Sequence, residues 1–145
     1  MAKRLSVSKN EMKHISRGIF QYEGRKPIFY IKGGHGNDSI EYMERHHFPF
    51  KVEDPLPNGV RMGWIDKHIN KDDTMAKNGH AWFPKFWSNW KIKKAGEKVA
   101  NGKANRECLD HTPMRGEIDG VKVVAYKGRG RICGVCPDFG NKKKK

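Results

Sequence analysis

The stretch G-H-A-W-F-P-K-F-W-S, residues 79–88, carries four aromatic side chains within six residues. They are Trp82, Phe83, Phe86 and Trp87. Aromatic side chains bury more apolar area than other residues, so a cluster this dense in a polar chain is expected to anchor the core. We therefore interpret the stretch first as a packing corner.

The residues around this cluster predict a strand, a tight corner and a helix. Pro84 cannot donate to a sheet ladder and should end a strand over residues 81–83. The hydroxyl of Ser88 can cap a helix N-terminus. Apolar residues follow at helical spacing, namely Ile92, Ala95 and Val99. Gly102 stands where a C-cap glycine is expected.

Length and charge indicate one domain, residues 1–145, with a polyanionic partner. The chain has 30 Lys and Arg against 16 Asp and Glu, a formal charge of +14. It has no basic amphipathic helix and no long apolar run, so nucleic acid is favoured over a membrane. The three cysteines argue against a complete disulfide framework, and residues 1–8 do not resemble a signal peptide. Residues 1–7 and 141–145 are expected to be disordered.

Two short elements are predicted before the first glycine-rich run. The sequence S-K-N-E at residues 8–11 has the form of a capping box and predicts a helix of about two turns that closes at Gly18. Residues 19–22 and 27–32 are apolar-rich and predict a hairpin. Residues 33–36, G-G-H-G, either form a turn or let the backbone approach a ligand closely.

The rest of the chain completes an α+β pattern. Residues 39–43 fit either a strand or a helical turn. Loop signals dominate residues 44–76, with a strand expected within 60–65. Near the C-terminus, D-G at residues 119–120 is a hairpin signal. This turn joins the first two strands of a predicted three-stranded antiparallel meander, which ends at Pro137.

Four residues could form a zinc site. Cys108-x-x-His111 and Cys133-x-x-Cys136 supply ligands that suit tetrahedral zinc. However, residues i and i+3 of a regular strand point to opposite faces, so Cys133 and Cys136 should not chelate one ion. A zinc-stabilised binding domain is kept as an alternative.

Histidines suggest a second kind of chemistry. Two imidazoles and a cation suffice to cleave RNA without metal, because one takes the proton of the 2′-hydroxyl and the other protonates the leaving oxygen. The candidates are His14, at a predicted helix end, and His35, in the glycine-rich run. His46 or His47 could replace His35 in this pair.

Several motifs occur in an order that resembles the EndoU ribonuclease family, and its bacterial toxin branch in particular. They are H-x-x-x-G at residues 14–18, a G-G-x-H-like run at 33–35, F-P-x-x-W-S at 83–88, D-G-V-K at 119–122 and a G-R-I strand that closes with proline at 130–137. The resemblance spans residues 14–137. It implies that His14 and His35 are catalytic.

Two positions depart from the family pattern. The family lysine before the F-P corner is replaced by His80, and Lys77 is the nearest lysine upstream. We therefore count both as catalytic candidates. The family's Thr/Ser-x-Tyr in the last strand is replaced by G-V-C at residues 134–136. The substrate-binding positions that the resemblance implies are Gly34, Ser88, Gly134 and Cys136.

The resemblance implies an α+β fold with its site in a cleft between two halves. The implied reaction is endonucleolytic RNA cleavage to 2′,3′-cyclic phosphate ends, without metal or other cofactor, and transfer RNA is one candidate substrate. Bacterial members are toxin domains of larger secreted proteins in contact-dependent growth inhibition and related systems. They are delivered to the cytoplasm of a target bacterium and neutralised by a cognate immunity protein.

RNA recognition would then use phosphate contacts and base stacking, for which Trp64, Trp82 or Trp90 could serve if exposed. The alternative is a nucleic-acid-binding module on the same fold without catalysis, which the departures at His80 and residues 134–136 favour.

Overall fold

The structure is a computed structural model that describes residues 4–67 and 79–142. Lys77 and residues 143–145 lie outside this part. The helices and strands are α1 (Lys9–Ser16), β1 (Ile19–Glu23), β2 (Lys26–Lys32), α2 (Asn37–Arg45), β3 (Phe50–Val52), β4 (Arg61–Ile65), β5 (His80–Trp82), α4 (Asn89–Ala100), β6 (Met114–Ile118), β7 (Val121–Gly128) and β8 (Arg131–Pro137). Two short 3₁₀ helices are η1 (Lys103–Asn105) and η2 (Phe139–Lys142). The expected α+β class is confirmed.

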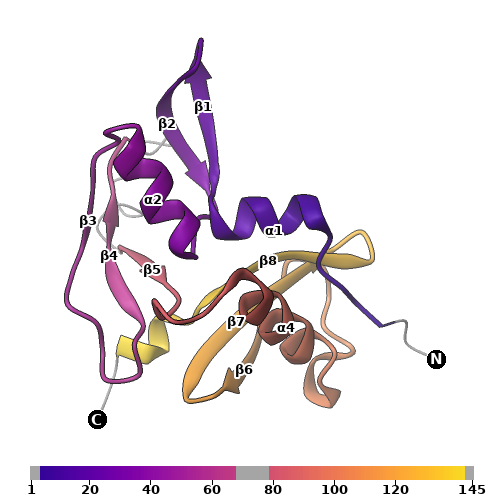
Figure 1. Cartoon of the computed structure of the whole chain (residues 1–145). Coiled ribbons are helices and arrows are strands. Elements are labelled where there is room, and N and C mark those ends of the chain that lie inside the picture. Colours follow the sequence, from indigo (N-terminus) through magenta and orange to yellow (C-terminus); the bar gives the residue numbers. More distant parts are fainter. Residues whose placement is uncertain (1–3, 68–78, 143–145) are drawn as a thin grey trace.

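The described strands form three antiparallel sheets, ordered β1-β2, β3-β4-β5 and β6-β7-β8. In Figure 1, β1 to β5 and α2 form the upper left part of the molecule, and α4 with β6 to β8 forms the lower right part. The predicted hairpin and C-terminal meander are both confirmed. Residues 39–43 belong to α2, which decides for the helical alternative, and β3 was not predicted.

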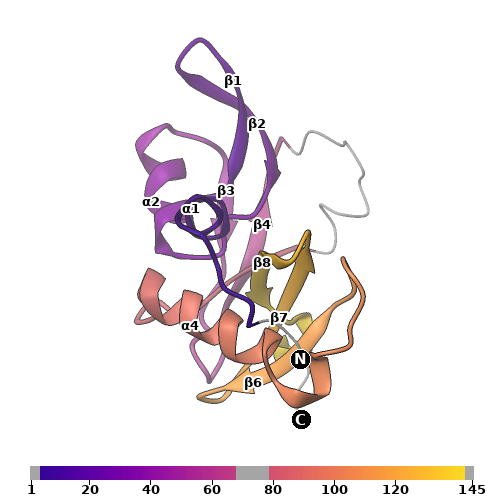
Figure 2. The ribbon, with the colours of Figure 1, turned by 90° about the vertical axis from the view of Figure 1, so that its right-hand side faces the viewer.

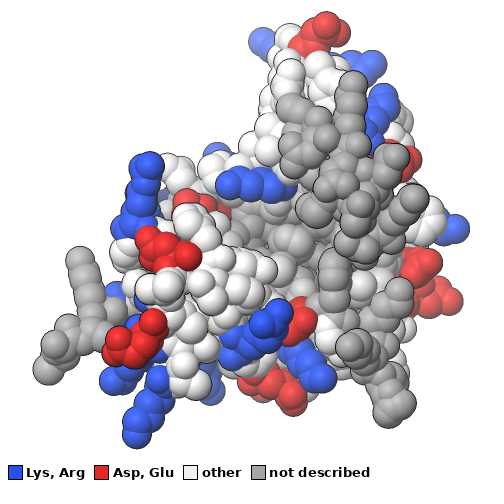
Figure 3. All heavy atoms as spheres, turned by 180° about the vertical axis from the view of Figure 1, so that it is seen from behind, with Lys and Arg blue, Asp and Glu red and all other residues white. Residues whose placement is uncertain are grey.

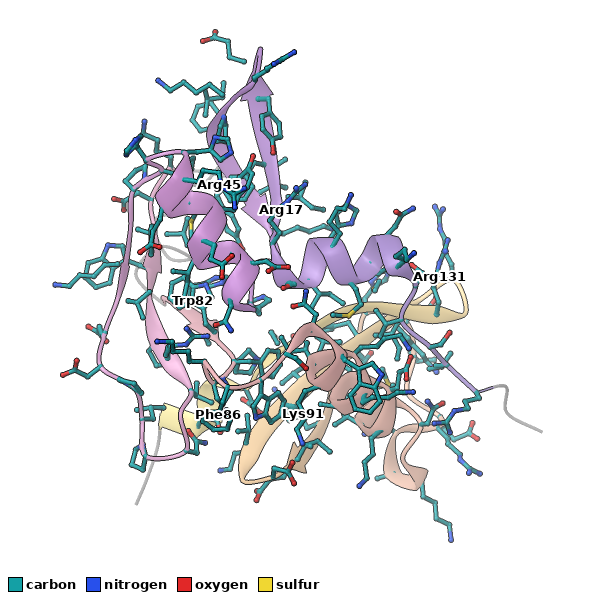
Figure 4. All side chains as sticks on the ribbon, in the orientation of Figure 1. Arg17, Arg45, Trp82, Phe86, Lys91 and Arg131 are labelled. Atoms are coloured by element: carbon teal, nitrogen blue, oxygen red, sulfur yellow. The ribbon has the colours of Figure 1, made fainter. Side chains whose placement is uncertain are left out.

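The aromatic corner joins two hydrophobic clusters. Trp82 is fully buried in the cluster of the upper part, while Phe83 and Trp87 belong to the cluster under α4. Phe86 does not follow this pattern, because 78% of its surface is exposed. In the turn that follows, the Trp87 amide donates to the Pro84 carbonyl (2.9 Å), and Trp87 is buried whereas Phe86 stays outside. Phe86 is labelled in Figure 4. The aromatic cluster anchors the core as expected, but Phe86 takes no part in that packing.

Helix α4 begins as the sequence predicts. The Ser88 hydroxyl accepts a hydrogen bond from the Lys91 amide (3.1 Å), and the helix buries Ile92, Ala95 and Val99. Its end differs from the prediction. Gly102 has φ −64° and is not a left-handed cap, because the helix closes at Asn101, whose amide donates to the Glu97 carbonyl (3.0 Å).

The segment before α1 is held against α4. The Asn101 side chain accepts from the Leu5 amide (2.7 Å) and donates to the Leu5 carbonyl (2.8 Å). The Glu97 carboxylate accepts from the amide of Val7 (3.1 Å), which is buried. Leu5 and Val7 lie in the lead that was expected to be disordered, and these polar groups hold their backbone against α4.

Surface charge is dispersed on the face turned away in Figure 1. Figure 3 shows Lys and Arg side chains around the whole outline of this face, interspersed with Asp and Glu. Within the described ranges, no helix is long and apolar enough to cross a bilayer. On this face the described cations do not gather into one basic patch.

The glycine-rich loop, residues 33–36, closes the end of α1. The last carbonyls of a helix have no partner within the helix. Here the amides of Gly34, His35 and Gly36 donate to the carbonyls of His14 (3.1 Å), Ile15 (2.7 Å) and Ser16 (3.1 Å). Gly33 and Gly34 have φ of +80° and +76°, values that L side chains rarely adopt. The loop and the helix end thus form one hydrogen-bonded unit.

This unit should fail if Gly33 gains a side chain. A Cβ at Gly33 would overlap the carbonyl oxygen of His14, whereas Gly24, also at positive φ (+65°), has nothing within 4 Å. We expect Gly33→Ala to lower the free energy of unfolding by more than about 3 kcal/mol, through strain plus the lost loop contacts. Gly24→Ala is the control and should cost about 1 kcal/mol. Urea denaturation measures both, and equal losses would contradict the capping role of the loop.

Candidate active site

His14 and His35 open into the same cavity. This first cavity has a volume of about 520 Å³, and a second of about 400 Å³ lies beside it. The two share the lining residues Lys32, Gly33, His35, Tyr126 and Cys136. We call the two cavities together the histidine cleft. Its walls come from α1, the end of β2, the glycine-rich loop, and strands β4, β5, β7 and β8. In Figure 2, β7 and β8 both lie below α1.

His14 lies in the last turn of α1 and reaches solvent. Its side chain is 45% exposed, and its Nδ1 lies 4.0 Å from the Glu11 carboxylate, one turn earlier on the helix. The two groups form an ion pair when the imidazole is protonated. His14 can therefore carry a proton at the mouth of the first cavity.

His35 has a different environment. Its Nδ1 lies 2.7 Å from the Ala81 carbonyl oxygen, which can only accept, so Nδ1 carries the hydrogen and Nε2 is left with a lone pair. Burial lowers the pKa of His35 from 6.5 to about 4, against the opposing effect of the hydrogen bond to Ala81. His35 is therefore neutral at pH 7 and can accept a proton at Nε2.

His80 occupies the position at which the family lysine was expected. Its ring stacks on that of His35, with centroids 4.5 Å apart and planes 5° apart. Its Nε2 lies 2.6 Å from the Gly34 carbonyl oxygen, and its ring meets Tyr30 and Trp82 edge to face. Only 8% of its surface is exposed. These contacts suit a residue that supports His35 and the glycine-rich loop.

The other expected substrate-binding positions are divided. Gly134 lines the first cavity and Cys136 lines both. Gly34 is buried in the loop between α1 and His80, and Ser88 lies outside both cavities with its hydroxyl on the α4 cap. Burial and, to a lesser extent, Asp138 raise the pKa of the Cys136 thiol to about 12, so this thiol stays protonated.

A bulge changes the faces of β8. The pairing of β7 with β8 shifts between Tyr126 and Lys127, and Cys133 has no partner there. With this extra residue, Ile132 and Val135 both point into the core, while Cys133 and Cys136 both line the cleft. The prediction that these two cysteines point to opposite faces is therefore wrong.

The four candidate zinc ligands are not brought together as a set. Cys133 and His111 lie close to each other at the first cavity, but Cys108 packs against the core cluster under α4. In residues 4–67 and 79–142, no group of three or more His, Cys, Asp or Glu is placed to hold a metal ion.

The alternative second histidines lie elsewhere. His46 follows α2 with its ring 4.4 Å from that of Tyr42, and His47 is the next residue. Neither lines the histidine cleft. Of the tryptophans considered for base stacking, Trp82 is fully buried, Trp64 lines the second cavity, and Trp90 is exposed on α4.

Sequence reasoning missed three residues of the cleft as partners of the two histidines. Lys32 ends β2 and lines both cavities, as does Tyr126, which pairs with Gly134 across the sheet. His111 enters the first cavity from the loop before β6, where its φ is +65°. The position of Lys32 directly before the glycine run was a usable signal, whereas Tyr126 and His111 depend on the strand register.

The buried, neutral state of His35 should make stability depend on pH. Between pH 6.5 and about 4 the unfolded chain binds a proton at this residue and the folded chain does not. The free energy of unfolding should therefore fall as the pH is lowered through this window, by on the order of 3 kcal/mol. His35→Asn keeps a donor for the Ala81 carbonyl but does not titrate, and should flatten this part of the curve. Urea unfolding of both proteins at a series of pH values tests this prediction. If the free energy of unfolding depends on pH in the variant as it does in the wild type, the effect comes from a group other than His35.

The chain was compared with known proteins in three ways. Searches among curated proteins and among solved structures gave no match. A sequence profile described as Bacterial EndoU nuclease matches residues 8–139, which include α1, the glycine-rich loop, the aromatic corner and the C-terminal meander. By this match over nearly the whole chain, the protein belongs to the bacterial EndoU nuclease family.

Proposed function

We propose that the protein is a metal-independent endoribonuclease that leaves 2′,3′-cyclic phosphate ends. The observation that carries this proposal is that two histidines in different protonation environments open into one cavity. His35 is partly buried and neutral, and His14 is exposed beside a carboxylate. A pair of imidazoles divided in this way suits one base and one acid.

His35 is the general base of the proposed reaction. Its Nε2 takes the proton of the 2′-hydroxyl, and the 2′-oxygen attacks the adjacent phosphorus. The hydrogen bond from Nδ1 to the Ala81 carbonyl (2.7 Å) holds the tautomer that this step requires. A bound phosphate raises the pKa of the buried imidazole toward neutrality, because opposite charge nearby favours its protonated form.

His14 is the general acid. It gives its proton to the 5′-oxygen as the bond between that oxygen and phosphorus breaks. The products are a 2′,3′-cyclic phosphate and a free 5′-hydroxyl, so the step needs no water molecule and no metal. Glu11 lies 4.0 Å from Nδ1 and forms an ion pair with the imidazolium.

Lys32 supplies the cation that stabilises charge on the phosphate oxygens. It lines both cavities beside His35, and among the described residues its amine forms no ion pair. His80, in contrast, is engaged by His35 and the Gly34 carbonyl, which supports a positioning role. Lys77 remains a candidate outside the described residues. A lysine at the reacting phosphate acts as a point charge on its oxygens.

The biological context is also a proposal. Membership of the bacterial EndoU nuclease family supports a toxin domain that acts on RNA, transfer RNA included, after delivery to the cytoplasm of a target bacterium as part of a larger secreted protein. The cytoplasm contains such RNA in abundance. A cognate immunity protein would be needed to protect the producing cell.

A second candidate function is a nucleic-acid-binding module that has lost catalysis. One observation favours it. A base whose pKa is about 4 is weak at pH 7, and Gly134 and Cys136 provide neither a hydroxyl nor an aromatic ring in β8. This module would bind RNA with strong salt dependence and no turnover.

Cleavage in the presence of EDTA separates the two functions. Purified protein incubated with bacterial RNA and EDTA should give fragments that end in 2′,3′-cyclic phosphate. His14→Ala and His35→Asn should each lower the rate by at least about a hundredfold with circular dichroism unchanged, because each removes one proton transfer. Intact RNA with wild-type protein, or cleavage that EDTA stops, would contradict the proposal.

Lys32 is tested against a lysine at the other end of β2. Lys32→Ala should lower kcat by about a hundredfold, as expected for loss of a transition-state cation, with a smaller effect on KM. Lys26→Ala removes the same charge outside both cavities and should retain activity. Equal effects of the two substitutions would mean that Lys32 contributes only general electrostatic attraction for RNA and not stabilisation of the transition state.

A further inference from the structure

Helix α4 and the segment before α1 form a groove outside the histidine cleft. Its volume is about 590 Å³, and its lining includes Arg4, Trp90, Lys94, Lys98 and Asn101. We call this the α4 groove. Trp90 exposes 66% of its surface to solvent. This is unusual, because a tryptophan side chain is large and apolar and is highly buried in most proteins. None of these residues lines the histidine cleft.

The groove carries net positive charge. Three cationic side chains line it, and Glu97 is the one acid of its described lining. That carboxylate is 4% exposed and accepts from Lys93 Nζ (2.7 Å) and the Val7 amide (3.1 Å). It also pairs with Lys94 Nζ (3.6 Å), one of the three cations of the groove, so that Arg4 and Lys98 carry the unpaired charge of the groove. Glu97 is thus neutralised within the fold and leaves an excess of positive charge toward solvent.

Trp90 and its neighbours have the composition of a nucleobase platform. The Lys94 amine lies 5.5 Å from the centroid of the Trp90 ring. Exposed aromatic rings flanked by cations bind single strands, because each base can stack on the ring while the cations contact the phosphates. An acidic protein surface is the alternative occupant of such a groove, and the binding test below distinguishes it from RNA.

We propose that the α4 groove binds a single-stranded segment of the RNA substrate away from the site of cleavage. The proposal rests on the proposed function for the identity of the ligand, but the binding itself needs no catalysis. Single-stranded RNA combines unstacked bases with one negative charge at each phosphate, which matches the exposed indole and the excess cations.

The groove lies within reach of the cleft along the chain. Five residues, 4–8, lead from Arg4 to α1, and α1 places His14 near its far end. The extended segment spans at most about 17 Å, and the eight residues of α1 span about 12 Å. Lys9 and Lys13 are exposed on this route. An RNA strand several nucleotides long can therefore occupy groove and cleft together, whereas a dinucleotide in the cleft cannot.

The first test measures binding in a His35→Asn background, so that RNA is not consumed. Trp90→Ala should weaken binding of a long, labelled single-stranded RNA by about tenfold, the loss expected for one stacked base. Lys98→Ala should lower the slope of log affinity against log salt by about 0.7. The matched controls are Phe86→Ala, an aromatic outside the groove that is 78% exposed, and Lys26→Ala, a lysine on the β1–β2 hairpin. Equal effects of test and control variants would overturn the proposal.

The second test compares substrate lengths in the active protein. The ratio of kcat/KM for the long RNA to that for a dinucleotide should fall about tenfold in Trp90→Ala, through KM. An unchanged ratio would overturn the groove as an RNA site. Absence of cleavage in wild type would instead defeat the proposed function, and the binding comparison would still decide the groove. Undiminished RNA binding by Trp90→Ala in that comparison would also overturn the proposal and leave the groove to a protein partner.

Discussion

Three hydrogen bonds from the glycine-rich loop to the end of α1 hold the histidine cleft together. Their donors are consecutive amides and their acceptors consecutive carbonyls, from His14 to Ser16. His14 is itself one of the residues whose carbonyl is bonded, and His35 is one of those whose amide donates. The backbones that carry the two histidines are therefore joined by one row of hydrogen bonds, although 20 residues lie between His14 and His35 in the sequence.

The same loop is tied on its other side to the aromatic corner. The His35 carbonyl accepts from the Phe83 amide (2.7 Å), and its ring donates to Ala81. Ala81 and Phe83 belong to one hydrophobic cluster and Trp82 to the other. The site thus stands where the two cores meet, and its rigidity comes from both. A buried imidazole is tolerated there because stacking on His80 and the bond to Ala81 satisfy it.

Local signals in the sequence were enough for much of the fold. The caps at Ser8 and Ser88, the D-G turn and the apolar spacing of α4 act within a few residues, and the structure agrees with them. The outward orientation of Phe86 and the bulge in β8 depend on tertiary packing, which the periodicity of the sequence does not reveal.

The sequence also indicated part of the candidate site. His14 and His35 stood in recognisable motifs and do share a cavity, as expected for a pair. The role of His80 could not be predicted from the sequence. Whether its ring is packed or open to a substrate depends on its contacts with residues such as Gly34 and Trp82. Lys32 stands directly before the glycine run, which was a usable signal, but that the end of β2 faces both cavities is known only from the structure.

The bulge in β8 has a consequence for how relatives of this chain should be compared. In a strand with one extra residue, the alternation of core-facing and cleft-facing positions shifts by one after the insertion. A relative with a regular last strand would present its cleft side chains at alternate positions, and these would align to core residues here unless one gap is placed near Cys133. Apparent loss of a substrate-contacting side chain in such an alignment can therefore be a shift in phase, and the cross-strand Tyr126 fills the space that Gly134 leaves open.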